Sequence, residues 1–220
     1  MTSLNGPRST KRDLRHAARR RRRRLAAELD QAAAGLAIVE ALLPLVRAPA
    51  RVAVYESLPT EPPTGPLIAA LTAAGCEVIV PVTLADFSLD WRYAVPGAVA
   101  GPATTARRTE GTKGTDGTDG TDGTTGGTLG RRALAACSLV VAPGLAVDRR
   151  GVRLGQGGGC YDRALAALTP GVPVLTLLHE GEASSADLPC DEHDERVDGY
   201  VTTSGRLVWL TGRSQAPGEG

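Results

Sequence analysis

Four glycines within five positions mark the stretch of this sequence that is best suited to chemistry: Gly155, Gly157, Gly158 and Gly159. They follow the apolar run 139–142 and precede the apolar run 164–168, which predicts a strand, a glycine-rich loop and a helix in that order. Such a loop lets backbone N–H groups approach a ligand, and the following helix points the positive end of its dipole at the same place. We expect an anion site, with phosphate as the best fit. A tight turn without a ligand is the alternative, and no Lys-Ser or Lys-Thr pair follows to make a P-loop.

Carboxylates near this loop add a possible metal site. Asp162 lies just beyond the glycines, where a magnesium ion bridging to phosphate would need an oxygen ligand, and the acidic segment 187–198 can supply another. Cys190 and His193 could suggest zinc, but the sequence offers no second Cys/His cluster to complete four ligands. A nucleophile pair of Cys160 and His193 is a further, weaker alternative.

The first element that could position these groups is a basic helix near the start of the chain. Thr10 and Asp13 have the spacing of a capping box, which predicts a helix beginning there. The run 19–24 consists of six arginines, which we expect to solvate one face of the helix. Contact with nucleic acid is the alternative, but aromatic residues, at 3% of the chain, are too few for base stacking. One long helix is predicted by apolar residues at helical spacing: Leu14, Ala18, Leu25, Leu29 and Ala32.

The remaining elements predict an α/β fold. Alternating strands and helices are expected at 35–46 (helix), 51–55 (strand), 64–74 (helix), 77–82 (strand), 138–142 (strand), 159–168 (helix), 172–178 (strand), 200–203 (strand) and 207–210 (strand). Repeated strand, helix, strand units imply a mostly parallel sheet with helices on both faces. Ligands of such sheets bind beyond the carboxyl ends of the strands, where segment 55–61 and the glycine-rich loop are expected.

Length and composition indicate the number of domains and the segments without regular structure. The chain has 220 residues, 42% of them hydrophobic, which fits one domain at 10–210 with disordered ends at 1–9 and 211–220. A flexible insertion is expected at about 101–130, because its Gly-Thr-Asp repeats contain no apolar residue to bury.

The compartment follows from the cysteines and from the apolar runs. The chain has four cysteines without a C-x-x-C pair, no secretory signal, and no apolar run near the roughly 20 residues of a membrane span. We expect a cytoplasmic protein, without a membrane partner, that acts as a monomer. Cys76 and Cys137, at predicted strand starts, are expected to be inert core thiols.

Four segments of the chain carry a resemblance to a known family. In chain order they are Lys11-Arg12-Asp13-Leu14-Arg15, Tyr55-x-Ser57-x-x-x-Glu61, Pro143 to Asp148 followed by Arg153 to Asp162, and Leu188 to Asp194. In this order and spacing they resemble the 5-formyltetrahydrofolate cyclo-ligase family, also called methenyltetrahydrofolate synthetases, over roughly residues 10–205. The resemblance implies a three-layer α/β/α sandwich of the kind found in sugar-phosphate isomerases and CoA transferases. It also implies a reaction that depends on ATP and magnesium.

In the reaction that the resemblance implies, the formyl oxygen of 5-formyltetrahydrofolate attacks the γ-phosphate of ATP and gives an imino-phosphate. N10 then closes the ring and phosphate leaves, so that the products are 5,10-methenyltetrahydrofolate, ADP and phosphate. Phosphoryl transfer of this kind needs positioning and charge neutralisation more than a protein nucleophile. A non-catalytic relative that binds nucleotide or RNA through its basic first helix is the alternative, although we do not expect nucleic-acid binding.

The resemblance also implies roles for individual residues. Arg153 and Tyr161 are the implied catalytic residues, and Asp162 and Asp194 the implied magnesium ligands. Cys160 stands where the family usually has an aromatic residue. Implied ATP contacts are Lys11, Arg12, Asp13, Leu14, Arg15, Arg153, Leu154, Gly155, Gln156, Gly157, Gly158, Gly159, Cys160 and Tyr161. Implied folate contacts are Glu56, Glu61, Gln156, Gly157, Gly158, Gly159 and Cys160.

Overall fold

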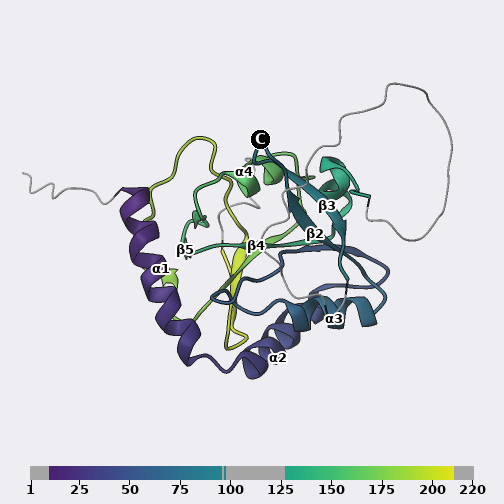
Figure 1. The fold of residues 1–220 in the computed structure, drawn as a ribbon, viewed down its shortest axis with the longest axis horizontal. Helices are drawn as coiled ribbons and strands as arrows, with labels where there is room; N and C mark the ends of the chain where they lie inside the picture. Colours follow the sequence, from purple (N-terminus) through teal and green to yellow (C-terminus); the bar gives the residue numbers. More distant parts are fainter. Residues whose placement is uncertain (1–9, 96, 98–126, 211–220) are drawn as a thin grey trace, which may run out of the picture.

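A computed structural model describes residues 10–95, 97 and 127–210, and a seven-stranded sheet lies at the centre of this part of the chain (Figure 1). Its strands are β1 (Arg51–Val54), β2 (Glu77–Thr83), β3 (Leu89–Tyr93), β4 (Leu139–Pro143), β7 (Val174–Leu178), β9 (Gly199–Thr202) and β10 (Leu207–Trp209). They lie in the order β10-β9-β7-β4-β1-β2-β3. The five strands β9, β7, β4, β1 and β2 are parallel, and β10 and β3 pair antiparallel at the edges.

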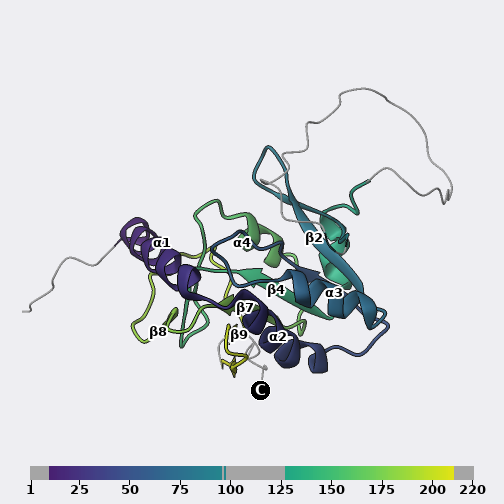
Figure 2. The same cartoon turned by 60° about the horizontal axis from the view of Figure 1, so that its bottom comes forward.

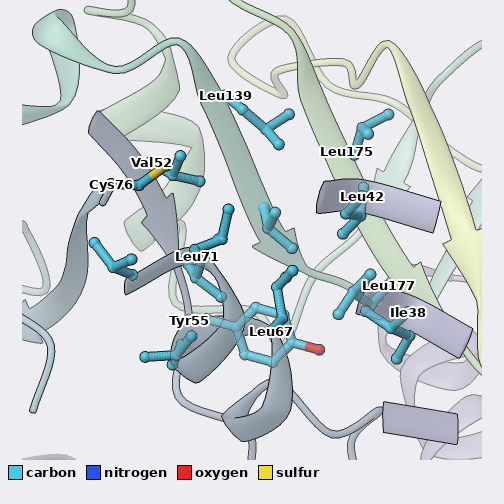
Figure 3. Close-up of a cluster of buried hydrophobic side chains, with 14 of the residues drawn as sticks. Ile38, Leu42, Val52, Tyr55, Leu67, Leu71, Cys76, Leu139, Leu175 and Leu177 are labelled. Atoms are coloured by element: carbon cyan, nitrogen blue, oxygen red, sulfur yellow. The ribbon is translucent and has the colours of Figure 1, made fainter. Parts of the chain in front are cut away.

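Helices cover both faces of this sheet. On one face, α2 (Gln31–Leu42) and α3 (Gly65–Ala73) pack on the strands, and Figure 3 shows Ile38 and Leu42 of α2 and Leu67 of α3 among the strand side chains. On the other face lie α4 (Cys160–Leu165) and the 3₁₀ helix η2 (Arg131–Ala136), which share a core cluster with β3, β4 and β7. The expected three-layer α/β/α arrangement with a mostly parallel sheet is therefore confirmed.

Helix α1 (Lys11–Glu28) lies apart from these layers, on the side of the molecule away from β2 and α3 (Figures 1 and 2). A second sheet lies beside this helix. Its strands are, in order, β6 (Arg153–Leu154), β5 (Ala146–Asp148) and β8 (Ala183–Ser184). Leu14 and Ala18 of α1 pack on a small apolar cluster under this sheet, which includes Leu145 and Leu154. The position of α1 is thus fixed beside the loops that follow β4 and β7.

The start of α1 confirms the predicted capping box, because the Thr10 hydroxyl and the Asp13 carboxylate each bond the other's backbone N–H. The prediction of one helix through Ala32 is wrong. The backbone of Leu29 is extended, and the Asp30 carboxylate accepts hydrogen bonds from the N–H groups of Ala32 and Ala33, both at 3.0 Å. This cap begins α2 at Gln31, so the second helix starts four residues before the predicted Gly35.

Other elements also differ from the sequence expectations. Strand β3 is not among the predicted elements, although its buried Leu89 and Trp91 alternate with the charged Asp90 and Arg92 as is typical of a half-buried edge strand. Helix α4 ends at Leu165 rather than at 168 and has only six residues.

The predicted chain ends 1–9 and 211–220, and most of the predicted insertion 101–130, lie outside the described residues. At the last part of that segment, Leu129 donates a backbone hydrogen bond of 2.7 Å to the carbonyl of Trp91.

Candidate functional site

A cavity of about 390 Å³ opens at the carboxyl ends of the parallel strands, where the sequence predicted a ligand site. The whole glycine-rich loop forms part of its wall, together with the start of α1, the hairpin of β2 and β3, and the acidic loop before β9. Its lining residues are Lys11, Arg15, Pro81, Thr83, Leu89, Pro143, Arg153, Leu154, Gly155, Gln156, Gly157, Gly158, Gly159, Cys160, Tyr161, Asp162, Asp191 and Asp194.

The glycine-rich loop is shaped by backbone conformations that side chains disfavour. Gly157 has a φ of 111° and Gly159 a φ of 64°, and both values lie in the left-handed region that favours glycine. Gly159 is also the N-cap residue of α4 and has no side chain to occupy the cavity. The loop therefore presents backbone to the cavity, which favours the anion site over a tight turn without a ligand.

One face of α1 carries four cations that reach this region. Lys11 binds the carboxylates of Asp191 and Asp194, with 2.7 Å between Nζ and Asp191 Oδ2. Arg15 donates from Nε to the carbonyl of Gly155 at 3.0 Å. Arg19 donates from Nε to Gln156 Oε1 at 3.0 Å and from Nη2 to the Gln156 carbonyl at 2.7 Å.

The fourth cation, Arg22, is only 2% exposed and binds the buried Glu182. The expectation that the whole run 19–24 solvates a face is therefore wrong for Arg19 and Arg22. Six consecutive helical residues point in every direction, and these two continue the line that Lys11 and Arg15 begin. Their spacing from Lys11, by eight and eleven positions, shows in the sequence that they share a helix face with Lys11, but it does not show that Arg22 is buried.

Two carboxylates of the cavity wall could hold a magnesium ion. Asp162 Oδ1 accepts from Arg153 Nη2 at 2.8 Å and from the Glu195 N–H at 3.4 Å, so Asp162 lies against the loop that carries Asp194. Burial alone raises the pKa of Asp194, but hydrogen bonds from Lys11 and from the Asp191 N–H outweigh it and hold that pKa below its usual value. Asp194 is thus an anionic oxygen donor at neutral pH.

These donors fit magnesium better than zinc. Among the described residues, no group of three or more His, Cys, Asp or Glu side chains is arranged to hold a metal ion. Magnesium usually takes one or two protein carboxylates and completes its coordination with phosphate oxygens and water, so Asp162 and Asp194 suffice for it. Zinc requires a fuller protein ligand set, and the alternative of a zinc site at Cys190 and His193 gains no support.

Arg153 and Tyr161 meet at the base of the cavity. Arg153 is 7% exposed, donates from Nη1 to the Pro143 carbonyl at 3.0 Å, and lies 5.8 Å from the centre of the Tyr161 ring. Its Nε and the Tyr161 hydroxyl are buried without a partner in the described structure. Burial raises the pKa of Tyr161, so its hydroxyl stays protonated and can donate a hydrogen bond to a ligand.

Glu56 and Glu61 lie outside the lining of this cavity. Glu56 pairs with Arg92, whose Nη2 lies 2.8 Å from each carboxylate oxygen. Glu61 is 5% exposed, so it is not a solvated loop acid, and the nearby Gln156 side chain, which lines the cavity, lowers its pKa. Oε2 of Glu61 accepts from the Leu58 N–H at 3.0 Å.

The cysteines divide as expected between core and site. Cys76 and Cys137 are buried, and burial raises the pKa of Cys137 to about 12, so this thiol stays protonated. Cys160 is half-buried in the cavity wall, whereas His193 is not among the lining residues, which gives the nucleophile pair no support.

Three comparisons place the chain among known proteins. The model of the 5-formyltetrahydrofolate cyclo-ligase family matches residues 7–203. A curated protein of Mycolicibacterium smegmatis, named 5-formyltetrahydrofolate cyclo-ligase, is 26% identical over 164 residues, which cover 72% of this chain and 76% of that protein.

Two solved structures share the fold. The 5,10-methenyltetrahydrofolate synthetase of Aquifex aeolicus aligns with a TM-score of 0.64 and 21% identity, over 93% of this chain and 95% of that chain. The synthetase of Mycoplasma pneumoniae aligns with a TM-score of 0.61 and 16% identity, over 90% of this chain and 100% of that one.

The helices in the described part of the chain include none that is long and apolar enough to cross a membrane. The family model covers most of the chain, including every segment that lines the cavity. The chain therefore belongs to the 5-formyltetrahydrofolate cyclo-ligase family and is a ligase.

Proposed function

We propose that this chain uses ATP and magnesium to convert 5-formyltetrahydrofolate into 5,10-methenyltetrahydrofolate, with release of ADP and phosphate. The observation that carries the proposal is the single cavity at which a glycine-rich backbone loop, several cations and two carboxylates converge. Phosphoryl transfer needs these parts, because its rate depends on positioning and on neutralisation of phosphate charge.

The phosphates of ATP bind along Gly155 to Gly159 in this proposal. Lys11 and Arg15 of α1 and Arg153 of β6 line the same cavity, and Arg15 contacts the loop at Gly155. Asp162 and Asp194 would hold the magnesium ion, which neutralises phosphate charge when it is bound.

The folate binds beside the nucleotide, next to Gln156. The Gln156 side chain lines the cavity and lies near Glu61, whose pKa it lowers, so a small rearrangement of Gln156 would expose the Glu61 carboxylate to the folate. Tyr161 donates its free hydroxyl to the reacting oxygens, and Arg153 offsets their negative charge. The remaining contacts that the family resemblance implies, including Arg12, Asp13 and Glu56, belong to this proposal as well.

A nucleic-acid role for α1 has less support. Lys11, Arg15, Arg19 and Arg22 all bond groups of this chain, which leaves Arg20, Arg21, Arg23 and Arg24 as the exposed cations of the run. A monomer in the cytoplasm fits a small-molecule reaction of this kind, and we include both in the proposal.

The products of ATP test this function against nucleotide binding alone. We expect ADP and phosphate to form in equal amounts only when 5-formyltetrahydrofolate and magnesium are both present. No ADP formation by a folded chain that still binds ATP or RNA would favour the alternative of a non-catalytic relative.

A further inference from the structure

Arg22 joins three loops that follow neighbouring strands of the sheet. Its Nη2 donates to the carbonyl of Gly144, directly after β4. Its Nε and Nη2 bind Glu182, after β7, with distances of 2.8 Å to Oε1 and 2.6 Å to Oε2. Its Nη1 lies 4.0 Å from Oε1 of Glu61, after β1. One guanidinium group thus connects the carboxyl ends of three adjacent parallel strands.

A second chain of hydrogen bonds leads from Glu182 through His179 back to the turn of Glu61. Oε2 of Glu182 also accepts from the His179 N–H at 2.9 Å. The His179 ring donates from Nε2 to the carbonyl of Thr60 at 2.9 Å, since a carbonyl can only accept. Thr60 precedes Glu61, so the turn that carries Glu61 is held from its backbone and from its side chain.

The three charged side chains of this network, Arg22, Glu182 and Glu61, are buried. Arg22, Glu182 and Glu61 are 2%, 4% and 5% exposed, so one cation faces two carboxylates away from water. Glu182 takes the bidentate contact, and the remaining Nη1 faces Glu61. Burial raises the pKa of Glu61, and the Leu58 N–H, Arg22 and Gln156 oppose that rise. Loss of the cation would therefore favour protonation of Glu61.

The same helix also holds the residue that lies between Glu61 and the cavity. Arg19, one turn before Arg22, donates to Oε1 of Gln156, and the Gln156 side chain is close enough to Glu61 to lower the pKa of that carboxyl. We infer that Arg22 is a positioning residue for the cyclisation: its contacts hold the Glu61 carboxylate behind Gln156, where the folate substrate binds. This inference rests on the proposed function, and within the run 19–24 Arg22 alone is fully buried.

Variants with and without the Arg22 cation test the inference. Arg22→Gln with Glu182→Gln removes both charges of the buried pair and keeps polar groups of similar shape, so neither charge is left buried alone. We expect the KM for 5-formyltetrahydrofolate to rise about tenfold or more, because Glu61 loses the cation that holds its carboxylate in place. The KM for ATP should change less than about twofold, because Arg22 lies outside the cavity lining.

Matched variants control for charge and for folding. Arg23→Gln changes the exposed neighbour of Arg22 on the same helix and should leave both KM values unaltered. Glu182→Gln alone keeps the cation beside Glu61 and should affect the folate KM less than the double change. If the double variant fails to fold, Arg22→Lys replaces it: the lysine keeps the charge but loses the bidentate contact to Glu182, so the folate KM should rise while the KM for ATP changes less than about twofold.

A double-mutant cycle that combines these changes with Glu61→Gln separates this inference from the proposed function. We expect Glu61→Gln to raise the folate KM, and the Arg22 and Glu182 changes to add little in that background. Two outcomes overturn the positioning role alone. In one, the folded double variant has an unaltered folate KM. In the other, its effect on the folate KM adds fully to that of Glu61→Gln. An unaltered folate KM in Glu61→Gln overturns the folate role of Glu61 and this inference with it, whereas product formation by the unchanged chain still tests the reaction.

Discussion

The Lys11 ammonium group shows how tightly single charges are coupled in this site. It is bound between Asp191 and Asp194 at the cavity wall, and one of these carboxylates is a proposed magnesium ligand. Burial lowers the pKa of Lys11, but the two carboxylates outweigh burial and raise it, so Lys11 stays cationic. A phosphate entering the cavity would meet this cation at the first turn of α1.

We therefore expect Lys11→Ala to raise the KM for ATP about tenfold, because a charge-assisted phosphate contact contributes roughly 1.5–3 kcal/mol. Steady-state kinetics at fixed ionic strength provide the measurement. Arg20→Gln together with Arg23→Gln removes two cations from exposed positions of the same helix and is the matched control. The opposite ranking of these two variants would move the phosphate contact away from the first turn.

Asp162 is the residue at which a charge can be removed with least change of shape. In Asp162→Asn, the amide oxygen can still accept from Arg153, as Oδ1 of Asp162 does at 2.8 Å, so folding should be retained. Loss of a metal-ligand charge should reduce kcat and raise the magnesium concentration needed for half-maximal rate, each by about tenfold or more. Titration of the rate with magnesium checks this, and an unaltered magnesium requirement would assign Asp162 a structural role.

Among the elements, the turn between β5 and β6 depends on one buried carboxylate. Asp148 is 1% exposed and accepts hydrogen bonds from the Arg150 and Val152 N–H groups, from the Arg150 guanidinium, and from the Leu188 N–H. These bonds connect the turn to the start of the acidic loop that carries Asp194. Asp148 thus supports one wall of the cavity from behind.

Asp148→Asn should lower the free energy of unfolding by about 2–4 kcal/mol, because several hydrogen bonds to a buried charge are weakened together. Urea denaturation at neutral pH provides the measurement. Asp187→Asn is a matched control, since Asp187 binds Arg149 and Arg150 at the surface and should contribute less than about 1 kcal/mol. Equal effects of the two changes would contradict the role given to burial.

The effect of Asp148 should also depend on pH in a defined direction. Burial alone raises the pKa of Asp148, but its hydrogen bonds outweigh burial and hold the pKa below the ordinary value of 3.8. Its stabilisation is then complete above the unfolded pKa and is lost as the pH falls through the folded pKa. The difference between the unchanged chain and Asp148→Asn should stay constant from pH 7 to about 5 and shrink below about pH 4.

The elements also show what the sequence could reveal. Apolar runs and the Thr10 cap predicted the parallel strands and the start of α1, because these patterns depend on neighbours in the chain. The break at Asp30 was missed since the apolar spacing continues across it, and β3 was missed although its alternating Leu89, Asp90, Trp91 and Arg92 are typical of a half-buried strand. Arg22 was missed for a different reason: a buried arginine is recognisable only once Glu182, 160 residues away, is placed against it.

At the scale of the whole molecule, α1 completes a site that the sheet begins. The strands bring the glycine-rich loop, the turn of Glu61 and the loop of Glu182 to one edge. Helix α1, on the outside of the three layers (Figure 2), then contacts all three through cations spaced along one face. Such an arrangement suits a reaction between two bound substrates, in which the protein contributes orientation and charge.

The most direct measurement of this function is the near-ultraviolet absorbance of a solution containing the purified chain, 5-formyltetrahydrofolate, ATP and magnesium. The methenyl product has a conjugated system that absorbs there, whereas the substrate does not. We predict that absorbance grows with time, that its rate is proportional to enzyme concentration, and that omitting ATP abolishes it. No growth with folded chain and both substrates present would contradict the proposed cyclisation.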